Sequence, residues 1–215
     1  MKAFASWSGG KDCMLAVYRY LQTNDHEMAC LVNMCDADGE QSRSHGIHKR
    51  FIQSQARAMN LPIVQQAVDA RGYESCFKAV VNELKKEGVT VGVFGDIYLV
   101  EHRQWIERVC EDLDVAPIFP LWENDTQALL MEFVELGFKA LTVAVHKNKL
   151  GEHWVGRELD LPFFKEITAI ADIDPCAENG EYHSFVYDGP LFSHPVAFEK
   201  GTPYEKDYHV FLPLK

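Results

Sequence analysis

The densest group of chemistry-bearing residues is the segment SGGKDC at residues 8–13. It follows a short apolar run at residues 2–6 and opens a stretch with helical spacing. Paired glycines let a backbone turn tightly, and the free amides at the start of a helix attract an anion. The segment therefore predicts an anion site, with polar groups from Ser6, Ser8, Gly9, Gly10 and Lys11.

This loop differs from two other phosphate-binding patterns. A Walker A loop would need glycine at the position of Ala5 and a hydroxyl at the position of Asp12. The spacing of a GxGxxG dinucleotide loop is also absent. The alternative is a plain strand–helix turn with a solvated Lys11. Cys13 has two interpretations as well, a weak phosphate donor or a small core residue.

A second polar group follows the apolar run VTVGVF at residues 89–94. Gly95 and Asp96 fall just past its carboxyl end, where open α/β sheets bind ligands. Asp96 is a candidate for Mg²⁺ or a ribose hydroxyl, or else a turn residue. Arg103 is a candidate phosphate or carboxylate contact, or else part of a surface ion pair.

The third group is ENGEYHS at residues 178–184. Glu178 and Glu181 could bind a cation or orient ammonia, and His183 could move a proton near neutral pH. The alternative is a solvated hairpin turn, with a His/Glu metal site as a minor interpretation. In the segment SRSHG at residues 42–46, His45 is either a substrate or nucleotide contact or a surface-loop residue.

The elements that must position these groups alternate along the first two-thirds of the chain. Helical spacing separates the apolar runs, so the pattern predicts an open parallel α/β sheet with right-handed crossovers. The expected strands are residues 2–6, 28–34, 61–64 and 89–94. The first expected helix begins at residue 12, and three further helices are indicated by apolar positions within residues 52–59, 77–84 and 106–113.

After Pro120 the regular alternation of apolar runs and helical spacing ends. Asp125 can cap a helix that ends at Gly137, and residues 138–145 read as a strand. Further short strands are expected at residues 182–187, 196–200 and 209–212. We therefore expect an α/β domain over residues 1–121 and a smaller α+β domain over residues 122–215.

Composition excludes several classes of protein. The 215 residues hold 21 Lys and Arg against 32 Asp and Glu, a net charge of −11, which disfavours nucleic acid as a partner. No apolar run is long enough for a membrane span, and no signal peptide opens the chain, so we expect a cytoplasmic location. The six cysteines form no CxxC pair and are expected to be reduced. The sequence does not decide whether the protein forms a homodimer.

The segment SGGKDC resembles the SGGxDS pyrophosphate loop of the N-type ATP pyrophosphatases, with Cys13 in place of the usual Ser or Thr. Four further segments accompany this loop: GDI at 95–97, PLW at 120–122, VGR at 155–157, and ENGEYHSF followed by VYDGP at 178–190. Together these segments resemble the diphthine–ammonia ligase family over nearly the whole chain. Ala177 replaces a glycine that many members carry.

The resemblance implies a PP-loop fold of the adenine nucleotide alpha hydrolase type, with ATP and Mg²⁺ as cofactors. It implies an AMP-forming ligase that activates a carboxylate as its acyl-adenylate, from which ammonia displaces AMP. The expected catalytic residues are Lys11, Asp12, Glu178, Glu181 and His183. The expected nucleotide contacts are Ser6, Ser8, Gly9, Gly10, Lys11, His45, Gly95, Asp96 and Arg103, and the metal contacts are Asp12 and Asp96.

The substrate implied by the family is diphthine, a modified histidine of elongation factor 2. The SRSHG form resembles the bacterial branch, and bacteria make no diphthamide, so a small cobamide-linked carboxylate is the alternative. A tRNA-modifying ATP pyrophosphatase would usually need a basic surface and often catalytic cysteines. A non-catalytic ATP-binding module is a third alternative, and the polar residues of the second domain argue against it.

Overall fold

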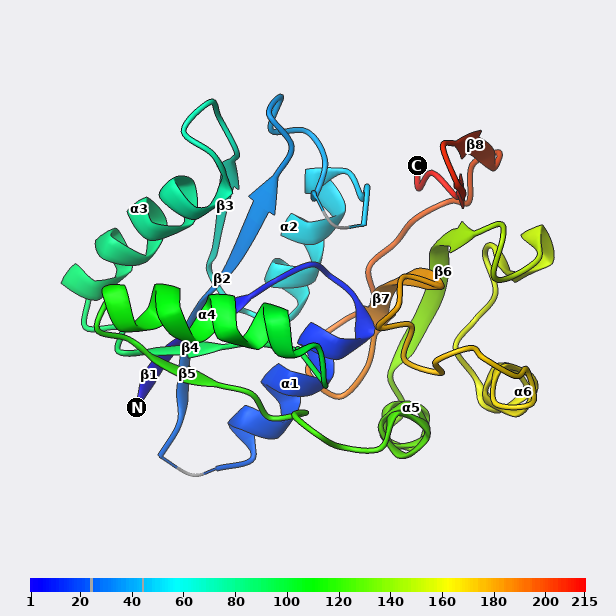
Figure 1. Ribbon diagram of the computed structural model, residues 1–215, viewed down its shortest axis with the longest axis horizontal. Helices are drawn as coiled ribbons and strands as arrows, with labels where there is room; N and C mark the ends of the chain where they lie inside the picture. Colours follow the sequence, from blue (N-terminus) through cyan, green and yellow to red (C-terminus); the bar gives the residue numbers. More distant parts are fainter. Residues whose placement is uncertain (24, 44) are drawn as a thin grey trace.

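The computed structural model describes residues 1–23, 25–43 and 45–215 of the chain. Two sheets lie side by side, a five-stranded parallel sheet and a four-stranded antiparallel one (Figure 1). This confirms the predicted α/β class with a smaller α+β part. Ser44 of the SRSHG segment lies outside the described residues.

The parallel sheet has the strand order β3-β2-β1-β4-β5. The chain runs outward from β1 to β3 and then returns to β4, so the order reverses between β1 and β4. Ligands of open α/β sheets bind at such a reversal, beyond the carboxyl ends of the strands. The elements of this part are β1 (Lys2–Ser6), α1 (Lys11–Leu21), β2 (Glu27–Cys35), α2 (Lys49–Ala58), β3 (Ile63–Ala67), α3 (Tyr73–Lys86), β4 (Val91–Val93), α4 (Val100–Asp112) and β5 (Ala116–Ile118).

The antiparallel sheet has the order β7-β6-β9-β8. Its elements are α5 (Thr126–Glu135), β6 (Lys139–His146), a 3₁₀ turn (Glu152–Trp154), α6 (Leu161–Ile167), β7 (Tyr182–Asp188), β8 (Tyr204–Lys206) and β9 (His209–Phe211). Asp125 caps α5, as predicted, because its side chain accepts a hydrogen bond from the amide of Ala128.

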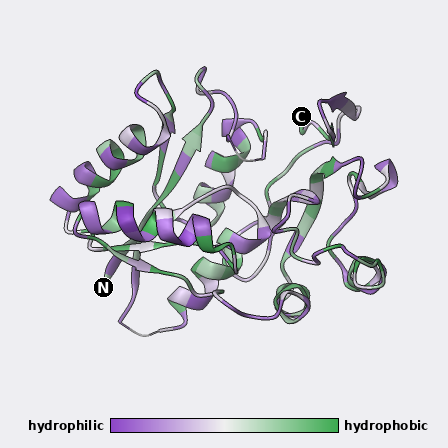
Figure 2. Cartoon of the chain, viewed as in Figure 1, coloured by the Kyte–Doolittle hydropathy of each residue, from purple (hydrophilic) through white to green (hydrophobic). Residues whose placement is uncertain are grey.

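Two apolar clusters hold these layers together. One contains buried residues of α3 and α4, such as Phe77 and Val109, on one face of the parallel sheet. The other joins α1 and α2 to the second part, and includes Met14, Ile52 and Phe185. Figure 2 shows the hydrophobic course of β6 and the mostly hydrophilic side of α4 that faces the viewer. The two parts of the chain therefore share a core, and the boundary at 121/122 stays a prediction.

Several predicted elements differ from the structure. Residues 196–200 form no strand, because Val196 bonds to Tyr187 while Glu199 bonds to Lys215, so no single partner strand continues the pairing. The strand expected at 61–64 begins later, at Ile63. The sequence analysis missed α6, β8 and β5, whose Pro117 is tolerated because β5 is an edge strand.

The described part of the chain holds no helix with the length and apolar character of a membrane crossing. All six cysteines are buried and free, as expected for reduced thiols.

Candidate active site

The predicted anion loop connects β1 to α1 across a sharp turn. Gly9 has a left-handed backbone, with φ +86°, and a Cβ at this position would lie 2.5 Å from Cδ1 of Ile52. Gly10 caps α1 with no side-chain bond, and a Cβ there would lie 2.4 Å from Cε1 of His45. The left-handed backbone at Gly9 favours glycine, whereas at Gly10 a side chain would have to displace the His45 ring. The loop therefore places the amino terminus of α1 where an anion can approach. The Gly10 amide itself donates to Oγ of Ser8 at 3.3 Å.

The loop is held from behind by β7 and by Gln55 of α2. The Val186 amide donates to the Gly9 carbonyl at 3.0 Å, and the Lys11 amide donates to Oγ of Ser184 at 3.1 Å. Gln55 is fully buried, and its Nε2 donates to the carbonyls of Gly9 at 2.9 Å and of Val186 at 2.6 Å. The two parts of the chain meet at the loop itself.

Gln55 is a functional residue that the sequence analysis missed. Its Oε1 accepts a hydrogen bond from Nε1 of Trp7 at 3.1 Å, so one amide joins three segments. A usable signal existed, because Gln55 interrupts the buried stripe of Phe51, Ile52 and Ala56 on α2. A polar residue on a buried helix face needs a partner, and here that partner is the loop.

Lys11 points into the second part of the chain. Its Nζ lies 2.9 Å from Oδ2 of Asp12, donates to the Cys176 carbonyl and sits 5.1 Å from the ring centre of Tyr182. Burial by itself lowers the pKa of Lys11, but the attraction of Asp12 and of neighbouring groups raises it well above its ordinary value. Lys11 is therefore charged inside the site.

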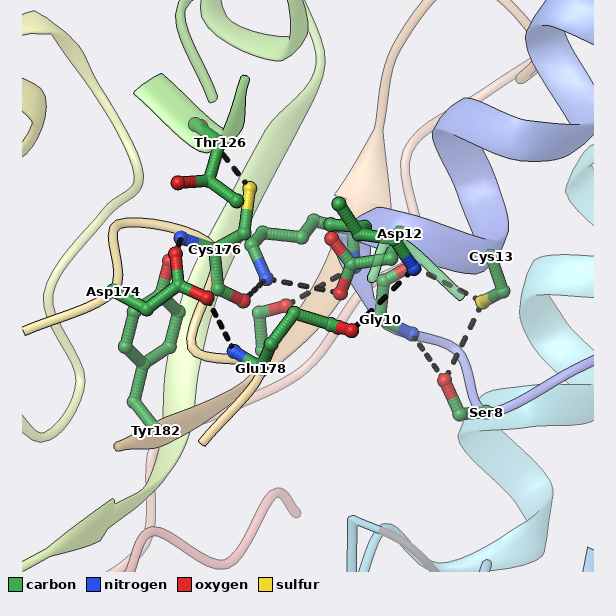
Figure 3. A network of polar contacts seen from close by, with 12 residues as sticks. Ser8, Gly10, Asp12, Cys13, Thr126, Asp174, Cys176, Glu178 and Tyr182 are labelled. Carbon is green, nitrogen blue, oxygen red and sulfur yellow. Dashed lines mark hydrogen bonds and ion pairs between the residues drawn. The ribbon is translucent and has the colours of Figure 1, made fainter. Parts of the chain in front are cut away.

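Three carboxylates line the cavity at the loop, those of Asp12 in the loop itself, Asp96 and Glu178. Figure 3 shows Asp12, Cys176 and Glu178 lying close together. Burial raises the pKa of all three acids, and for Glu178 to about 7, with further increases from the charges of Asp12 and Asp96. Oε2 of Glu178 accepts a hydrogen bond from the Ile97 amide at 3.4 Å. The site therefore holds more negative charge than Lys11 alone neutralises.

The predicted metal contacts, Asp12 and Asp96, fit Mg²⁺. Carboxylate oxygens are the ligands that Mg²⁺ prefers, and a divalent cation would relieve the repulsion between these acids. Within the described ranges no three His, Cys, Asp or Glu residues form a metal cluster of their own. Mg²⁺ here would complete its shell with phosphate oxygens and water, as it usually does beside a nucleotide.

The segment that carries Glu178 is organised by Asp174. Asp174 accepts hydrogen bonds from the Tyr98 hydroxyl at 2.8 Å and from the Glu178 amide at 3.1 Å. The Asp174 amide donates to Oε1 of Glu181 at 3.3 Å. Ala177 has a left-handed backbone, with φ +63°, a conformation that favours the glycine expected here from the resemblance.

Glu181 lies behind this segment and not in the cavity wall. Its side chain is 1% exposed, and its Oε2 has no hydrogen-bond partner among the described residues. Lys149 is 3.9 Å from the other oxygen. The structure therefore separates the two carboxylates that the sequence analysis had placed together: Glu178 lines the cavity and Glu181 supports the segment. A catalytic role for Glu181 stays a prediction that this geometry does not favour.

Two histidine rings close another side of the site. Nδ1 of His45 lies 2.9 Å from the Ser184 carbonyl, and its ring centre is 4.7 Å from that of His183. Burial lowers the pKa of His45 to about 4 and that of His183 well below its ordinary value. Both rings are therefore neutral near pH 7, and a neutral ring offers one N–H donor and one nitrogen acceptor for hydrogen bonds.

Most of the predicted site residues line one cavity of about 290 Å³. Gly95 approaches the loop closely, since a Cβ there would lie 2.8 Å from the Cys13 amide nitrogen. The Cys13 thiol donates to the Gly10 carbonyl at 3.2 Å, and burial raises its pKa, so it braces the loop from within as a neutral thiol. The predicted residues that share this cavity are Ser6, Ser8, Lys11, Asp12, His45, Gly95, Asp96, Glu178 and His183.

Arg103 lies away from this cavity. Its Nε donates to Oε1 of Glu107 at 2.7 Å, and its guanidinium lies 4.5 Å from the ring centre of Trp122. The structure thus favours the surface ion pair over a ligand contact.

An aromatic cavity of about 610 Å³ adjoins the first one at the carboxyl ends of β1 and β4. Its walls include Tyr73, Phe77, Phe94 and Trp105. Ser6, Tyr73, Asp96 and His102 line both cavities. A planar ring could stack in this second space while its substituents reach the anion loop.

The comparisons with known families match residues 1–117 to the diphthamide synthase N-terminal domain and residues 125–212 to the diphthamide synthase C-terminal domain. The chain belongs to the diphthamide synthase family. Similar curated proteins are the diphthine–ammonia ligases of Mus musculus (26% identical) and Homo sapiens (24% identical), each matching all of this chain and 89% of its own length. That of Danio rerio is 26% identical and covered to 92%. These matches confirm the resemblance and the prediction of an ATP-dependent amide-forming ligase.

Proposed function

We propose that this enzyme activates a carboxylate with ATP, releases pyrophosphate, and passes the acyl group from AMP to ammonia. The observation that carries the proposal is the meeting of the anion loop, charged Lys11 and the Asp12–Asp96 pair in one cavity with Glu178. The names of the relatives point to diphthine as the acyl substrate. A small carboxylate metabolite is the alternative.

ATP would bind across the two adjoining cavities. Ser8, the amino terminus of α1 and Lys11 would receive the β and γ phosphates, since these groups offer the hydrogen-bond donors and positive potential that pyrophosphate needs. The purine would stack between Tyr73 and Trp105 in the aromatic cavity. Mg²⁺ held by Asp12 and Asp96 would neutralise phosphate charge.

In the first step a carboxylate oxygen of the substrate attacks the α phosphorus, and the bond to the bridging oxygen of pyrophosphate breaks. Negative charge grows on the departing pyrophosphate. The Lys11 ammonium and the amino terminus of α1 would stabilise that charge. The loss of one such donor typically costs about 10²–10³-fold in rate.

In the second step ammonia attacks the acyl carbon and AMP leaves. Ammonium must lose a proton before it can attack, and Glu178, whose pKa is raised to about 7, can accept that proton near neutral pH. His183, which is neutral and lines the same cavity, can orient the nucleophile through its ring nitrogen. The two parts of the chain would thus divide the two half-reactions.

The test uses ATP labelled at the α phosphate, with Mg²⁺, ammonium and elongation factor 2 that carries diphthine. The expected product is AMP, in equal amount to the diphthamide formed, with no AMP from unmodified elongation factor 2. Labelled ADP as the main product would contradict α–β cleavage. If AMP forms with a small carboxylate but not with diphthine, the ligase activity is supported and the alternative substrate is the correct one.

A further inference from the structure

The loop that follows β4 holds the segment of Glu178 by three hydrogen bonds. The Tyr98 hydroxyl donates to Oδ2 of Asp174 at 2.8 Å and accepts a hydrogen bond from Nδ2 of Asn179 at 3.2 Å. One residue earlier in the loop, the Ile97 amide donates to Oε2 of Glu178 at 3.4 Å. The hydroxyl of Tyr98 thus contacts both ends of residues 174–179, and the neighbouring amide contacts the carboxylate between them.

Asp174 passes the Tyr98 contact on to the backbone of its own segment. Its Oδ2 also accepts a hydrogen bond from the Glu178 amide at 3.1 Å, and its Oδ1 accepts one from the Cys176 amide at 3.0 Å (Figure 3). Three donors therefore converge on one carboxylate. The backbone of Glu178 is held through Asp174, and its side chain is held through the Ile97 amide.

The hydroxyl of Tyr98 is carried by a ring that is itself fixed. The ring packs on the apolar cluster that joins α1 and α2 to the second part of the chain. Neither Tyr98 nor Asp174 lines the active-site cavity or the aromatic cavity, whereas Glu178 lines the first. Any effect of this pair on a bound substrate must therefore pass through the segment that it holds.

Resting on the proposed function, we infer that Tyr98 and Asp174 are positioning residues for the ammonia step. A proton acceptor acts only within hydrogen-bond reach of the proton that it takes, and a displacement of about 1 Å can cost a large part of the rate. In this step ammonium gives a proton to Glu178, and the nitrogen bonds to the acyl carbon as the bond from that carbon to AMP breaks. The pair holds Glu178 for this proton transfer and leaves adenylate formation to the anion loop.

The experiment lets two nucleophiles compete for one acyl-adenylate. The full chain receives ATP, Mg²⁺, elongation factor 2 that carries diphthine, ammonium and hydroxylamine, and mass spectrometry measures the ratio of amide to hydroxamate. Hydroxylamine is mostly unprotonated at neutral pH, so it attacks the acyl carbon without first giving a proton to Glu178. Both products arise from the same intermediate, so their ratio reports the ammonia step and is independent of ATP binding or of the folded fraction.

Tyr98→Phe keeps the packed ring and removes the hydroxyl. We expect the ratio of amide to hydroxamate to fall about tenfold, the order expected when a hydrogen bond to a charged group is lost. Exchange of labelled pyrophosphate into ATP, which reports adenylate formation, should stay within about twofold, since the contact serves only the second step. In Glu178→Gln the ratio should fall further, and adding Tyr98→Phe to that variant should lower it no more, because the two residues act as one unit.

The matched control is Tyr187→Phe. The Tyr187 hydroxyl donates to Oε2 of Glu158, also at 2.8 Å, and its ring packs on the same apolar cluster. Tyr187 lines neither cavity and does not contact the segment of Glu178, so the ratio should match that of the unaltered protein.

Three results would overturn the inference: an unchanged ratio in Tyr98→Phe, an equal fall in Tyr187→Phe, or a further fall when Tyr98→Phe is added to Glu178→Gln. An equal loss of pyrophosphate exchange and of amide in Tyr98→Phe would also overturn it, because the contact would then serve the whole site. If the unaltered protein forms neither amide nor hydroxamate and exchanges no pyrophosphate, the proposed function fails instead, so the two failures are distinct.

Discussion

The two regions that form the site reach it by different means. The anion loop at residues 8–13 depends on its backbone, since Gly9 is left-handed and a Cβ on Gly9 or Gly10 would meet the side chains of Ile52 or His45. The segment at residues 174–184 depends on side chains, with Asp174 accepting bonds from Tyr98, Cys176 and Glu178. A site formed by backbone groups therefore depends on consecutive residues, whereas a site formed by side chains depends on residues that are distant in the sequence.

The largest effect should come from the loop. Lys11→Ala removes the charge that we propose stabilises departing pyrophosphate, and we expect AMP formation to fall about 10²–10³-fold. Because Lys11 is buried against Asp12, the variant Lys11→Met tests the charge while keeping most of the volume. The exposed Lys86→Ala is the control and should keep full activity. Near-normal turnover of both Lys11 variants, with the fold intact by circular dichroism, would contradict the proposed role of the anion loop.

The next largest effect is expected in the segment at residues 174–184, where Glu178 and Glu181 can be compared. Glu178→Gln should lower amide formation about 10²-fold, because a proton acceptor in the cavity is lost. Glu181→Gln should change it by no more than about threefold, since Glu181 does not line the cavity. Steady-state rates of amide formation at saturating ammonium decide between the two carboxylates. Equal losses would restore the original prediction that both act on the substrate.

Gln55 connects the two regions, so its replacement tests whether they act as one unit. Gln55→Leu leaves the Val186 carbonyl and the Trp7 indole without their partner, and we expect the free energy of unfolding to fall by about 2 kcal/mol. The KM for ATP should rise, because the Gly9 carbonyl loses one of its two bonds. Urea unfolding and ATP titration measure both changes. A stable variant with unchanged KM would show that β7 alone holds the loop.

A smaller effect is expected in the aromatic cavity. Trp105→Ala should raise the KM for ATP about tenfold with little change in kcat, since a stacked base is worth about 1–3 kcal/mol. Trp122→Ala is the matched control, because Trp122 packs on Arg103 and lines neither cavity. Equal KM values for the two variants would place the purine elsewhere.

The smallest effect concerns stability against pH. The pKa of Glu178 is raised to about 7 in the folded protein by burial first, and by Asp12, from an ordinary value near 4.5. A raised pKa favours the protonated acid, so its contribution to stability is full below pH 4.5 and is lost as pH rises through 7. Replacing Glu178 by Gln should remove about 1 kcal/mol of that decline, a figure reduced for solvent screening. Urea midpoints at pH 5 and pH 8 provide the comparison, and identical declines in both proteins would contradict it.

The sequence predicted much of the first part and less of the second, for physical reasons. The parallel strands carry apolar runs such as VGV at 91–93, buried on both faces, and this pattern is local. Residues 196–200 begin with the apolar run VAF, but Val196 and Glu199 bond to different neighbours, which no local pattern reveals. Glu178 and Glu181 are three residues apart and equal in type, yet only the fold decides which one faces the cavity.

The most direct test of the central claim follows one oxygen atom. If the substrate carboxylate attacks the α phosphorus and ammonia then displaces AMP, one carboxylate oxygen must leave with the AMP phosphate. The measurement uses substrate with ¹⁸O in its carboxylate and mass spectrometry of the AMP released by the complete enzyme with ATP, Mg²⁺ and ammonium. We expect AMP that carries one ¹⁸O. AMP without the label, or ¹⁸O in inorganic phosphate beside ADP, would contradict an acyl-adenylate formed in this cavity.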